Sequence, residues 1–272
     1  MTYAKKSYGQ HFLTSESIAE KIADAMQPFG QIDSLVEVGP GKGMLTKYLV
    51  GQYKNLYLVE ADDDMVDILK HDTKFNEAHI IAQDYLRLDL HKLSQGNPIY
   101  IIGNFPYNIS SQIVIKMIDH RDIIPGMVGM FQKEMAERIA HAPGSREYGV
   151  ISVLTQAYYD VEYLFTVKEG NFNPPPKVKS GVLRFTRKEK LKLDCDEVEF
   201  KKIMKACFLQ KRKMIRNSLK PFLSTEKLQD SFFDKRPEEL AVDDFVRITN
   251  MAKPVVATAD TDHDIKKEQN NQ

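Results

Sequence analysis

Short apolar runs alternate with stretches of helical periodicity over the first 140 residues, and this alternation limits the possible folds more than any other feature of the sequence. Each apolar run predicts a strand, and each stretch with apolar residues three and four positions apart predicts a helix. Alternating strands and helices are typical of an α/β fold, in which helices cover both faces of a parallel sheet. The expected strands are 35–38, 56–59, 80–81, 99–102 and 127–131, and the expected helices are 15–27, 43–50, 62–70, 110–119 and one that ends near 139.

The pattern changes after the fifth strand and its helix. Residues 159–167 and 181–185 predict two more strands around the turn Pro174-Pro175-Pro176, and beyond about residue 190 the pattern is helical only, with helices expected at 198–209, 213–222 and 242–251. We therefore expect one domain over 1–190, which begins with a polar arm over 1–14, and a helical domain over 191–257. The polar residues 258–272 predict a disordered tail.

The composition fits a folded protein outside the membrane. Hydrophobic residues make up 42% of the 272, enough for a buried core, and no apolar run approaches the roughly 18 residues needed to cross a bilayer. Polar His11 and Thr14 interrupt any apolar segment of a signal peptide. Cys195 and Cys207 are too few and too far apart for a metal site or a disulfide framework. We expect a soluble, cytoplasmic protein that holds no metal.

The first predicted strand ends in a glycine-rich turn, Glu37-Val38-Gly39-Pro40-Gly41-Lys42-Gly43. Glycines let the backbone approach a ligand at the carboxyl end of a strand, but the G-x-G-x-G spacing lacks the third glycine that dinucleotide-binding proteins place at the start of a helix. Glu60 ends the second strand, where a carboxylate can bind both ribose hydroxyls, and Asp84 follows the third, where it can bind an adenine amino group. Such a turn can be purely structural. Together, however, Gly39, Gly41, Glu60 and Asp84 favour S-adenosylmethionine, a nucleoside with an amino-acid tail and no phosphate.

The fourth predicted strand leads into Gly103-Asn104-Phe105-Pro106-Tyr107-Asn108. This segment resembles the Asn-x-Pro-aromatic motif of enzymes that methylate exocyclic amino groups of nucleobases. The Asn104 oxygen and the Phe105 carbonyl can accept hydrogen bonds from an adenine N6 amine, which frees the nitrogen lone pair for attack. Pro106 stiffens the turn, and Tyr107 can stack on an extruded base. The alternative, a plain turn after a strand, is less favoured beside the cofactor residues.

Several segments together resemble the family of ribosomal RNA adenine dimethyltransferases, over nearly the whole chain. They are 6–13, 36–41 with 45–46, 103–110, 131–134, 148–149, 172–178 and 211–219. The resemblance implies a seven-stranded class I, Rossmann-like methyltransferase domain that uses S-adenosylmethionine, followed by a small all-helical C-terminal domain. It also implies transfer of four methyl groups to two adjacent adenines in the 3′-terminal hairpin loop of small-subunit (16S) ribosomal RNA, in a precursor of the small subunit, by a monomer.

The same resemblance implies which residues contact the cofactor: His11, Leu13, Gly39, Glu60, Asp84 and Asn104. Many members have Asn at the position of His11, where a backbone contact needs no particular side chain. Many also have Leu at the position of Phe105, so the pocket wall is reshaped here. Phe172, in the proline-rich segment, is expected either near the target base or in the core.

The formal net charge is zero, with 38 basic and 38 acidic residues, yet the charges are segregated. Residues 201–220 contain no Asp or Glu, and their basic residues are Lys201, Lys202, Lys205, Lys211, Arg212, Lys213, Arg216 and Lys220. Such a run can be a solvated helix face. Beside the catalytic motif it favours a phosphate-binding surface for structured RNA, with Lys211, Arg212, Lys213 and Arg216 as the expected contacts.

Three other functions compete with this interpretation. A large-subunit ribosomal RNA adenine dimethyltransferase of the antibiotic-resistance type shares both core motifs, but segment 211–219 favours the small-subunit enzyme. A non-catalytic RNA- or DNA-binding factor is disfavoured by the intact Asn104, Tyr107 and Glu60. A dinucleotide oxidoreductase is disfavoured by the glycine spacing.

Overall fold

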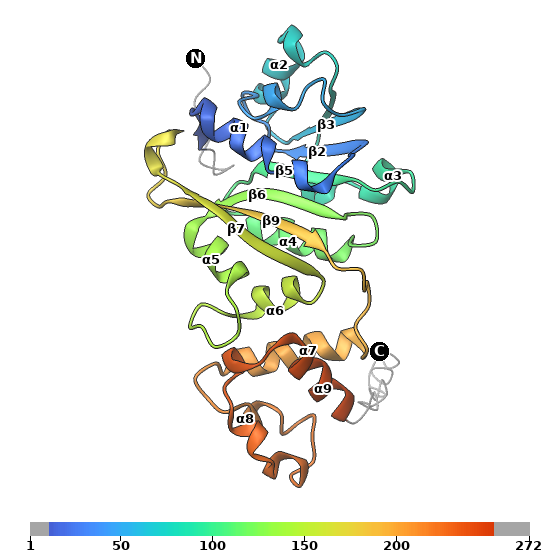
Figure 1. The fold of residues 1–272 in the computed structure, drawn as a ribbon, viewed down its shortest axis with the longest axis vertical. Coiled ribbons are helices and arrows are strands. Elements are labelled where there is room, and N and C mark those ends of the chain that lie inside the picture. The colour runs from blue at the N-terminus through green and yellow to red at the C-terminus, as the bar shows by residue number, and fades with distance from the viewer. Residues whose placement is uncertain (1–10, 253–272) are drawn as a thin grey trace, which may run out of the picture.

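The computed structural model describes residues 11–252 (Figure 1). Residues 1–10 and 253–272 lie outside the described residues, so most of the predicted arm and the whole predicted tail lie there too. In Figure 1 a sheet with its helices forms the upper part of the molecule, and a smaller helical part lies below it.

Seven strands form the main sheet, in the order β4-β3-β2-β5-β6-β9-β7. The first five are parallel to one another, as expected, whereas β9 is antiparallel to both β6 and β7. The chain between β7 and β9 holds no helical crossover long enough to bring the second strand back parallel to the first, so the two pair antiparallel. The expected α/β fold is confirmed, and the sheet is mixed at one edge. The strands are β2 (Ser34–Val38), β3 (Asn55–Glu60), β4 (His79–Ala82), β5 (Tyr100–Asn104), β6 (Gly126–Gln132), β7 (Tyr159–Val167) and β9 (Ser180–Arg187).

Helices cover both faces of this sheet, so its central strands bury side chains in two directions. In β2, Leu35 belongs to a cluster with Ile22 of α1, while the next residue, Val36, belongs to a cluster with Ile113 of α4. A strand buried on both faces is an unbroken apolar run, which is why the strands are visible in the sequence. The helices are α1 (Glu16–Asp24), α2 (Asp63–His71), α3 (Leu90–Ser94), α4 (Ser110–Asp119), α5 (Lys133–Ala140) and α6 (Val150–Gln156).

The structure departs from the predicted helices at four places, one of which is the unpredicted short helix α3. Residues 43–50 contain only a one-turn 3₁₀ helix, η3 (Thr46–Tyr48). Gly43 has a φ of 78°, outside the right-handed helical region, so it cannot be the first residue of a helix. α6 has no helical signature in the sequence, since its Val, Ile and Thr residues favour strands. α8 (Ile215–Ser218) is much shorter than the expected 213–222, so Lys213 precedes the helix in a turn.

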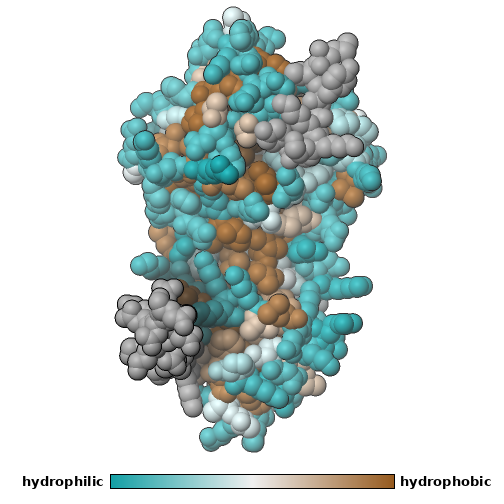
Figure 2. Space-filling model, turned by 180° about the vertical axis from the view of Figure 1, so that it is seen from behind, coloured by the Kyte–Doolittle hydropathy of each residue, from teal (hydrophilic) through white to brown (hydrophobic). Residues whose placement is uncertain are grey.

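The C-terminal part consists of α7 (Glu197–Leu209), α8 and α9 (Val242–Met251), joined by turns and short 3₁₀ helices. Its core is continuous with that of the upper part, since Ile203 of α7 and Leu154 of α6 belong to one buried cluster. Seen from behind, apolar surface gathers at mid-height, on a face that is otherwise largely hydrophilic (Figure 2). No helix of the described range is both long and apolar enough to cross a membrane.

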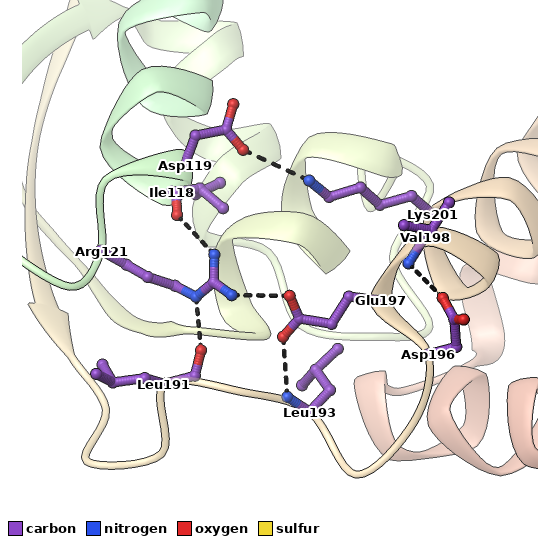
Figure 3. Close-up of polar contacts among 9 residues, drawn as sticks. All are labelled: Ile118, Asp119, Arg121, Leu191, Leu193, Asp196, Glu197, Val198 and Lys201. Atoms are coloured by element: carbon purple, nitrogen blue, oxygen red, sulfur yellow. Dashed lines mark hydrogen bonds and ion pairs between the residues drawn. The ribbon is translucent and has the colours of Figure 1, made fainter. Parts of the chain in front are cut away.

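Polar contacts also join the two parts (Figure 3). Arg121, which follows α4, donates to the Glu197 carboxylate at 2.8 Å and to the Leu191 carbonyl at 2.6 Å. Lys201 of α7 pairs with Asp119 at 3.4 Å. The Arg121 guanidinium is only 17% exposed in its ion pair, so the cost of leaving it unpaired would be large. These contacts flank the chain between β9 and α7, where the predicted boundary at residue 190 falls.

Candidate functional site

One cavity of about 540 Å³ opens where β2, β3, β4 and β5 end. Carboxyl ends of parallel strands share one edge of a sheet, which is where α/β proteins bind ligands, and the volume suits a small molecule. All the residues predicted from the sequence to bind the cofactor or to act on the target base lie on its wall. They are His11, Leu13, Gly39, Gly41, Glu60, Asp84, Asn104, Phe105, Pro106 and Tyr107.

The glycine turn after β2 brings bare backbone to the cavity. Gly41 has a φ of 55°, and a Cβ on it would come within 3.0 Å of the Phe12 ring. A side chain here would therefore strain the backbone and also displace the arm. Only η3 follows the turn, so this stretch of the described chain presents no α-helix N-terminus to a phosphate. The geometry thus agrees with the expected ligand, which has none.

Glu60, at the end of β3, is held by three backbone N–H groups. One oxygen accepts from Gly41 at 3.0 Å, and the other accepts from Ala61 at 2.9 Å and Asp62 at 3.0 Å. Burial raises the pKa of this carboxyl, and the three hydrogen bonds oppose that rise. A carboxylate has about four acceptor sites, so the three backbone donors fix Glu60 in place and leave one site, on the oxygen that binds Gly41, for a ligand hydroxyl.

Asp84 follows β4 and begins the 3₁₀ helix η5 (Tyr85–Arg87). Its Oδ1 accepts from the Leu86 N–H at 2.9 Å, which fixes the carboxylate. Its Oδ2 lies 3.9 Å from Nε of Arg87, a side chain that is 85% exposed. Asp84 therefore keeps acceptor capacity at the cavity wall.

Asn104 ends β5, and its side-chain amide has a defined orientation. Its Nδ2 donates to the backbone carbonyl of His11 at 3.0 Å. Within the described residues, Oδ1 has no hydrogen-bond partner, so it is the acceptor available to a ligand. The neighbouring Tyr107 hydroxyl lies 2.7 Å from Ser180 Oγ, and its ring lies 5.4 Å from that of His11. The Tyr107 ring is thus held from two sides.

The Phe105 side chain points into the core of the protein. It is 1% exposed and packs edge-on against Phe131, with a centroid distance of 5.2 Å. Its ring also covers Gly103 and Gly129, where an added Cβ would come within 2.7 and 2.2 Å of it. Phe105 is therefore a core residue, and it also forms part of the cavity wall.

The last residues of the arm close one side of the cavity. β1 (Phe12–Leu13) pairs with β8 (Phe172–Asn173). The His11 side chain turns to the proline-rich segment, where Nδ1 donates to the Pro174 carbonyl at 2.9 Å, while its backbone carbonyl holds Asn104. Phe172 is buried in the core at 4% exposure, and Asn173 lines the cavity in its place.

Glu37 also lines the cavity, although no role was predicted for it from the sequence. It is 1% exposed, and one of its oxygens has no hydrogen-bond partner among the described residues. Burial, together with the nearby charge of Glu60, raises the pKa of this carboxyl to about 8. The signal that could have revealed Glu37 is an acid inside an apolar strand, directly before a glycine turn.

In the basic segment 201–220, some side chains bind other groups of the protein and others do not. Lys211 donates to the carbonyls of Arg146 and Tyr148 at 2.6 and 2.7 Å, and Arg216 pairs with Asp234. In the described part of the chain no partner is found for the side chains of Arg212 and Lys213, which lie in the turn before α8. The structure also places no cluster of three or more His, Cys, Asp or Glu residues suited to a metal within 11–252.

Comparison with known proteins gives a consistent result. Residues 1–253 match the family model described as ribosomal RNA adenine dimethylase. The ribosomal RNA small subunit methyltransferase A of Bacteroides thetaiotaomicron is 49% identical over 257 residues, which cover 94% of this chain and 96% of that protein. The protein of the same name from Flavobacterium johnsoniae is 50% identical over 247 residues, covering 90% of this chain and 94% of that protein.

Solved structures share the fold. A dimethyladenosine transferase from Plasmodium falciparum superposes with a TM-score of 0.73 at 25% identity, covering 88% of this chain and 96% of that one. The 23S rRNA methyltransferase ErmE superposes with a TM-score of 0.67 at 20% identity, covering 88% and 99%, a likeness that concerns the fold alone. The expected class I, Rossmann-like methyltransferase fold with a helical C-terminal part is confirmed.

Proposed function

Since the chain belongs to the ribosomal RNA adenine dimethylase family, we propose that it transfers methyl groups from S-adenosylmethionine to the N6 nitrogens of two adjacent adenines in the 3′-terminal hairpin loop of 16S ribosomal RNA. One observation carries the proposal: Asn104, whose Oδ1 has no partner among the described residues, lines the same cavity as Glu60 and Asp84. A base amine and a nucleoside can therefore meet there.

The residues of the cavity fit S-adenosylmethionine, which supplies a methyl group on an already activated sulfonium. Glu60 accepts from a ribose hydroxyl, Asp84 accepts from the adenine amino group, and the turn at Gly39 and Gly41 leaves room for the ligand. The partnerless oxygen of Glu37 suits the positive charge that this ligand carries. No step calls for a metal.

The protein's part in the transfer is to position the amine. Asn104 Oδ1 and the Phe105 carbonyl accept hydrogen bonds from the N6 amine, so its lone pair points at the methyl carbon. Tyr107, held by Ser180, stacks on the extruded base. Alignment of the reacting atoms supplies much of the acceleration, and the proton leaves to water after transfer.

The partner is the precursor of the small ribosomal subunit, and the reaction belongs to ribosome biogenesis in the cytoplasm. Arg212 and Lys213 contact RNA phosphates. Lys211 and Arg216 anchor the segment to the rest of the protein and add their positive charge to the same surface. The proposed enzyme is a monomer.

The test compares Asn104→Ala with Asn104→Asp. Loss of the acceptor should abolish methyl transfer to small subunits from cells lacking this gene. Calorimetric affinity for S-adenosylhomocysteine should fall much less, because Asn104 is assigned to the target amine. The Asp variant keeps an oxygen but loses the donor to His11, and should retain part of the activity. Undiminished turnover by the Ala variant would refute the role of Asn104. Methylation of large subunits instead of small ones would favour the competing enzyme.

A further inference from the structure

Lys116 of α4 is a half-buried lysine whose ammonium group is fully engaged inside the protein. Its Nζ donates to the backbone carbonyls of Tyr85, Leu86 and Leu88 at 2.8, 3.0 and 2.6 Å. An ammonium has three donors, so all of them serve one short segment. Nζ also lies 5.1 Å from the centroid of the buried Tyr85 ring.

The segment that Lys116 binds is the one that carries Asp84. Asp84 is the N-cap of η5, where its carboxylate accepts from the Leu86 N–H. A carboxylate therefore holds the N-terminal end of this turn. At its other end the Leu86 and Leu88 carbonyls lack helical partners, and Lys116 satisfies both. The Tyr85 carbonyl, which Lys116 also binds, accepts from the Leu88 N–H as well. A negative group at the N-terminal end and a positive group at the C-terminal end both match the dipole of the turn. Lys116 also faces the charges of Asp84 and Asp89.

The same helix is attached to the other half of the site. α4 starts at Ser110, directly after the loop that holds Asn104 and Tyr107, and Ser110 Oγ donates to the Tyr107 carbonyl at 3.1 Å. One rigid helix therefore contacts the base-binding loop at its first turn and the Asp84 loop near its end. No other contact among the described residues gives Leu86 and Leu88 carbonyls a charged partner.

We propose that Lys116 is a positioning residue for recognition of the cofactor's adenine. By clamping the turn 85–88 it holds the Asp84 carboxylate at the distance and angle that the adenine amino group requires. This inference rests on the proposed function, in which Asp84 accepts from that amino group. Lys116 does not line the cavity, so it acts only through Asp84.

The experiment measures how well the protein discriminates between two ligands that differ at the base edge carrying the adenine amino group. S-adenosylhomocysteine and its inosine counterpart, in which an oxo group replaces the amine, are titrated calorimetrically into the wild-type protein and into Lys116→Met. The methionine keeps an unbranched apolar stem and loses all three donors. In Lys116→Met the affinity for S-adenosylhomocysteine should fall about tenfold, as expected for a lost charge-assisted contact. Affinity for the inosine ligand should fall much less, so the ratio of the two should shrink.

A second readout is the exchange of backbone amides at Leu86 and Arg87, which should become faster in the unliganded variant. Lys188→Met is the matched control, because Lys188 donates to the Gln156 carbonyl at 2.6 Å but does not line the cavity. It should leave the ratio unchanged. If Lys116→Met does not fold, Lys116→Arg is used, since a planar guanidinium cannot direct three donors from one atom; it too should shrink the ratio.

The outcomes separate the two ideas. A wild-type protein that does not bind S-adenosylhomocysteine would overturn the proposed function, and with it this inference. A wild-type protein that binds and discriminates, with the ratio unchanged in the folded Lys116 variant, would overturn the role of Lys116 alone. A general loss of affinity for both ligands to the same extent would count against positioning as well, because it would indicate a structural effect.

Discussion

Replacing the buried Glu37 by glutamine should change how the stability of the protein depends on pH. Glu37 is 1% exposed, and burial raises the pKa of its carboxyl from an ordinary value near 4.5 to about 8. The folded protein therefore keeps a proton on Glu37 between those pH values, whereas the unfolded chain releases it. Stability from this group is complete below the lower pKa and is lost as the pH rises through the higher one.

The size of the effect follows from the shift. Each pH unit between the two pKa values changes the free energy of unfolding by about 1.4 kcal/mol per proton. Over the whole interval the effect of Glu37 is about 5 kcal/mol, as an upper limit. Glutamine has the shape of the protonated acid and does not titrate. The Glu37→Gln variant should match the wild-type protein near pH 5 and become progressively more stable than it toward pH 8.

Urea unfolding from pH 5 to 8.5 measures this difference directly. Other titrating groups affect both proteins alike, so the quantity of interest is the difference between their free energies of unfolding. Parallel curves over that range would show that Glu37 is ionised in the folded protein, and would refute the reasoning. Ligand binding gives an independent check, because a cationic ligand favours the carboxylate. Binding of S-adenosylmethionine near pH 7 should release a proton, seen as buffer-dependent heat, and Glu37→Gln should release less.

Two further predictions concern the glycine turn and the basic segment. Gly41→Ala should lower the affinity for S-adenosylhomocysteine at least tenfold, because the new Cβ meets the Phe12 ring at 3.0 Å and a left-handed alanine costs roughly 1–2 kcal/mol. Gly144→Ala is the control, since Gly144 also has a positive φ but open space around it; equal losses would mean that the cavity is not involved. Replacing Arg212 and Lys213 together by glutamine should reduce the slope of log affinity for the small subunit against log salt by about 1.5. The same change at Lys201 and Lys202, which are ion-paired, should matter less, and an unchanged slope in the first variant would remove that turn from the RNA interface.

The sequence could predict the positions of the site residues because the rule that places them is local. Glu60, Asp84 and Asn104 each follow an apolar run, and runs buried on both faces stand out in a sequence. Once the strands are parallel, their carboxyl ends share an edge, and the three side chains must converge there. That argument needs no knowledge of any contact distant in sequence.

Contacts between distant segments could not be predicted in this way. Lys211 and Arg216 look like free cations in the sequence, yet one binds carbonyls more than 60 residues away and the other pairs with Asp234. In the helix expected over 43–50, the positive φ of Gly43 excludes the first residue, and only one 3₁₀ turn forms after it. The protonation of Glu37 depends on the depth of its burial, which only the packed sheet determines.

The orientation of the Asn104 side-chain amide also depends on segments distant in sequence, because the N-terminal arm binds its nitrogen. An asparagine amide can present either its oxygen or its nitrogen to a ligand, and only the oxygen can accept from an adenine amine. At Asn104 the orientation is set by the His11 carbonyl, 93 residues away, which accepts a hydrogen bond from the amide nitrogen. His11 is in turn fixed by Pro174, and the adjoining β1 by β8. Three segments that share no local pattern must therefore assemble before Asn104 can face a base with the correct atom.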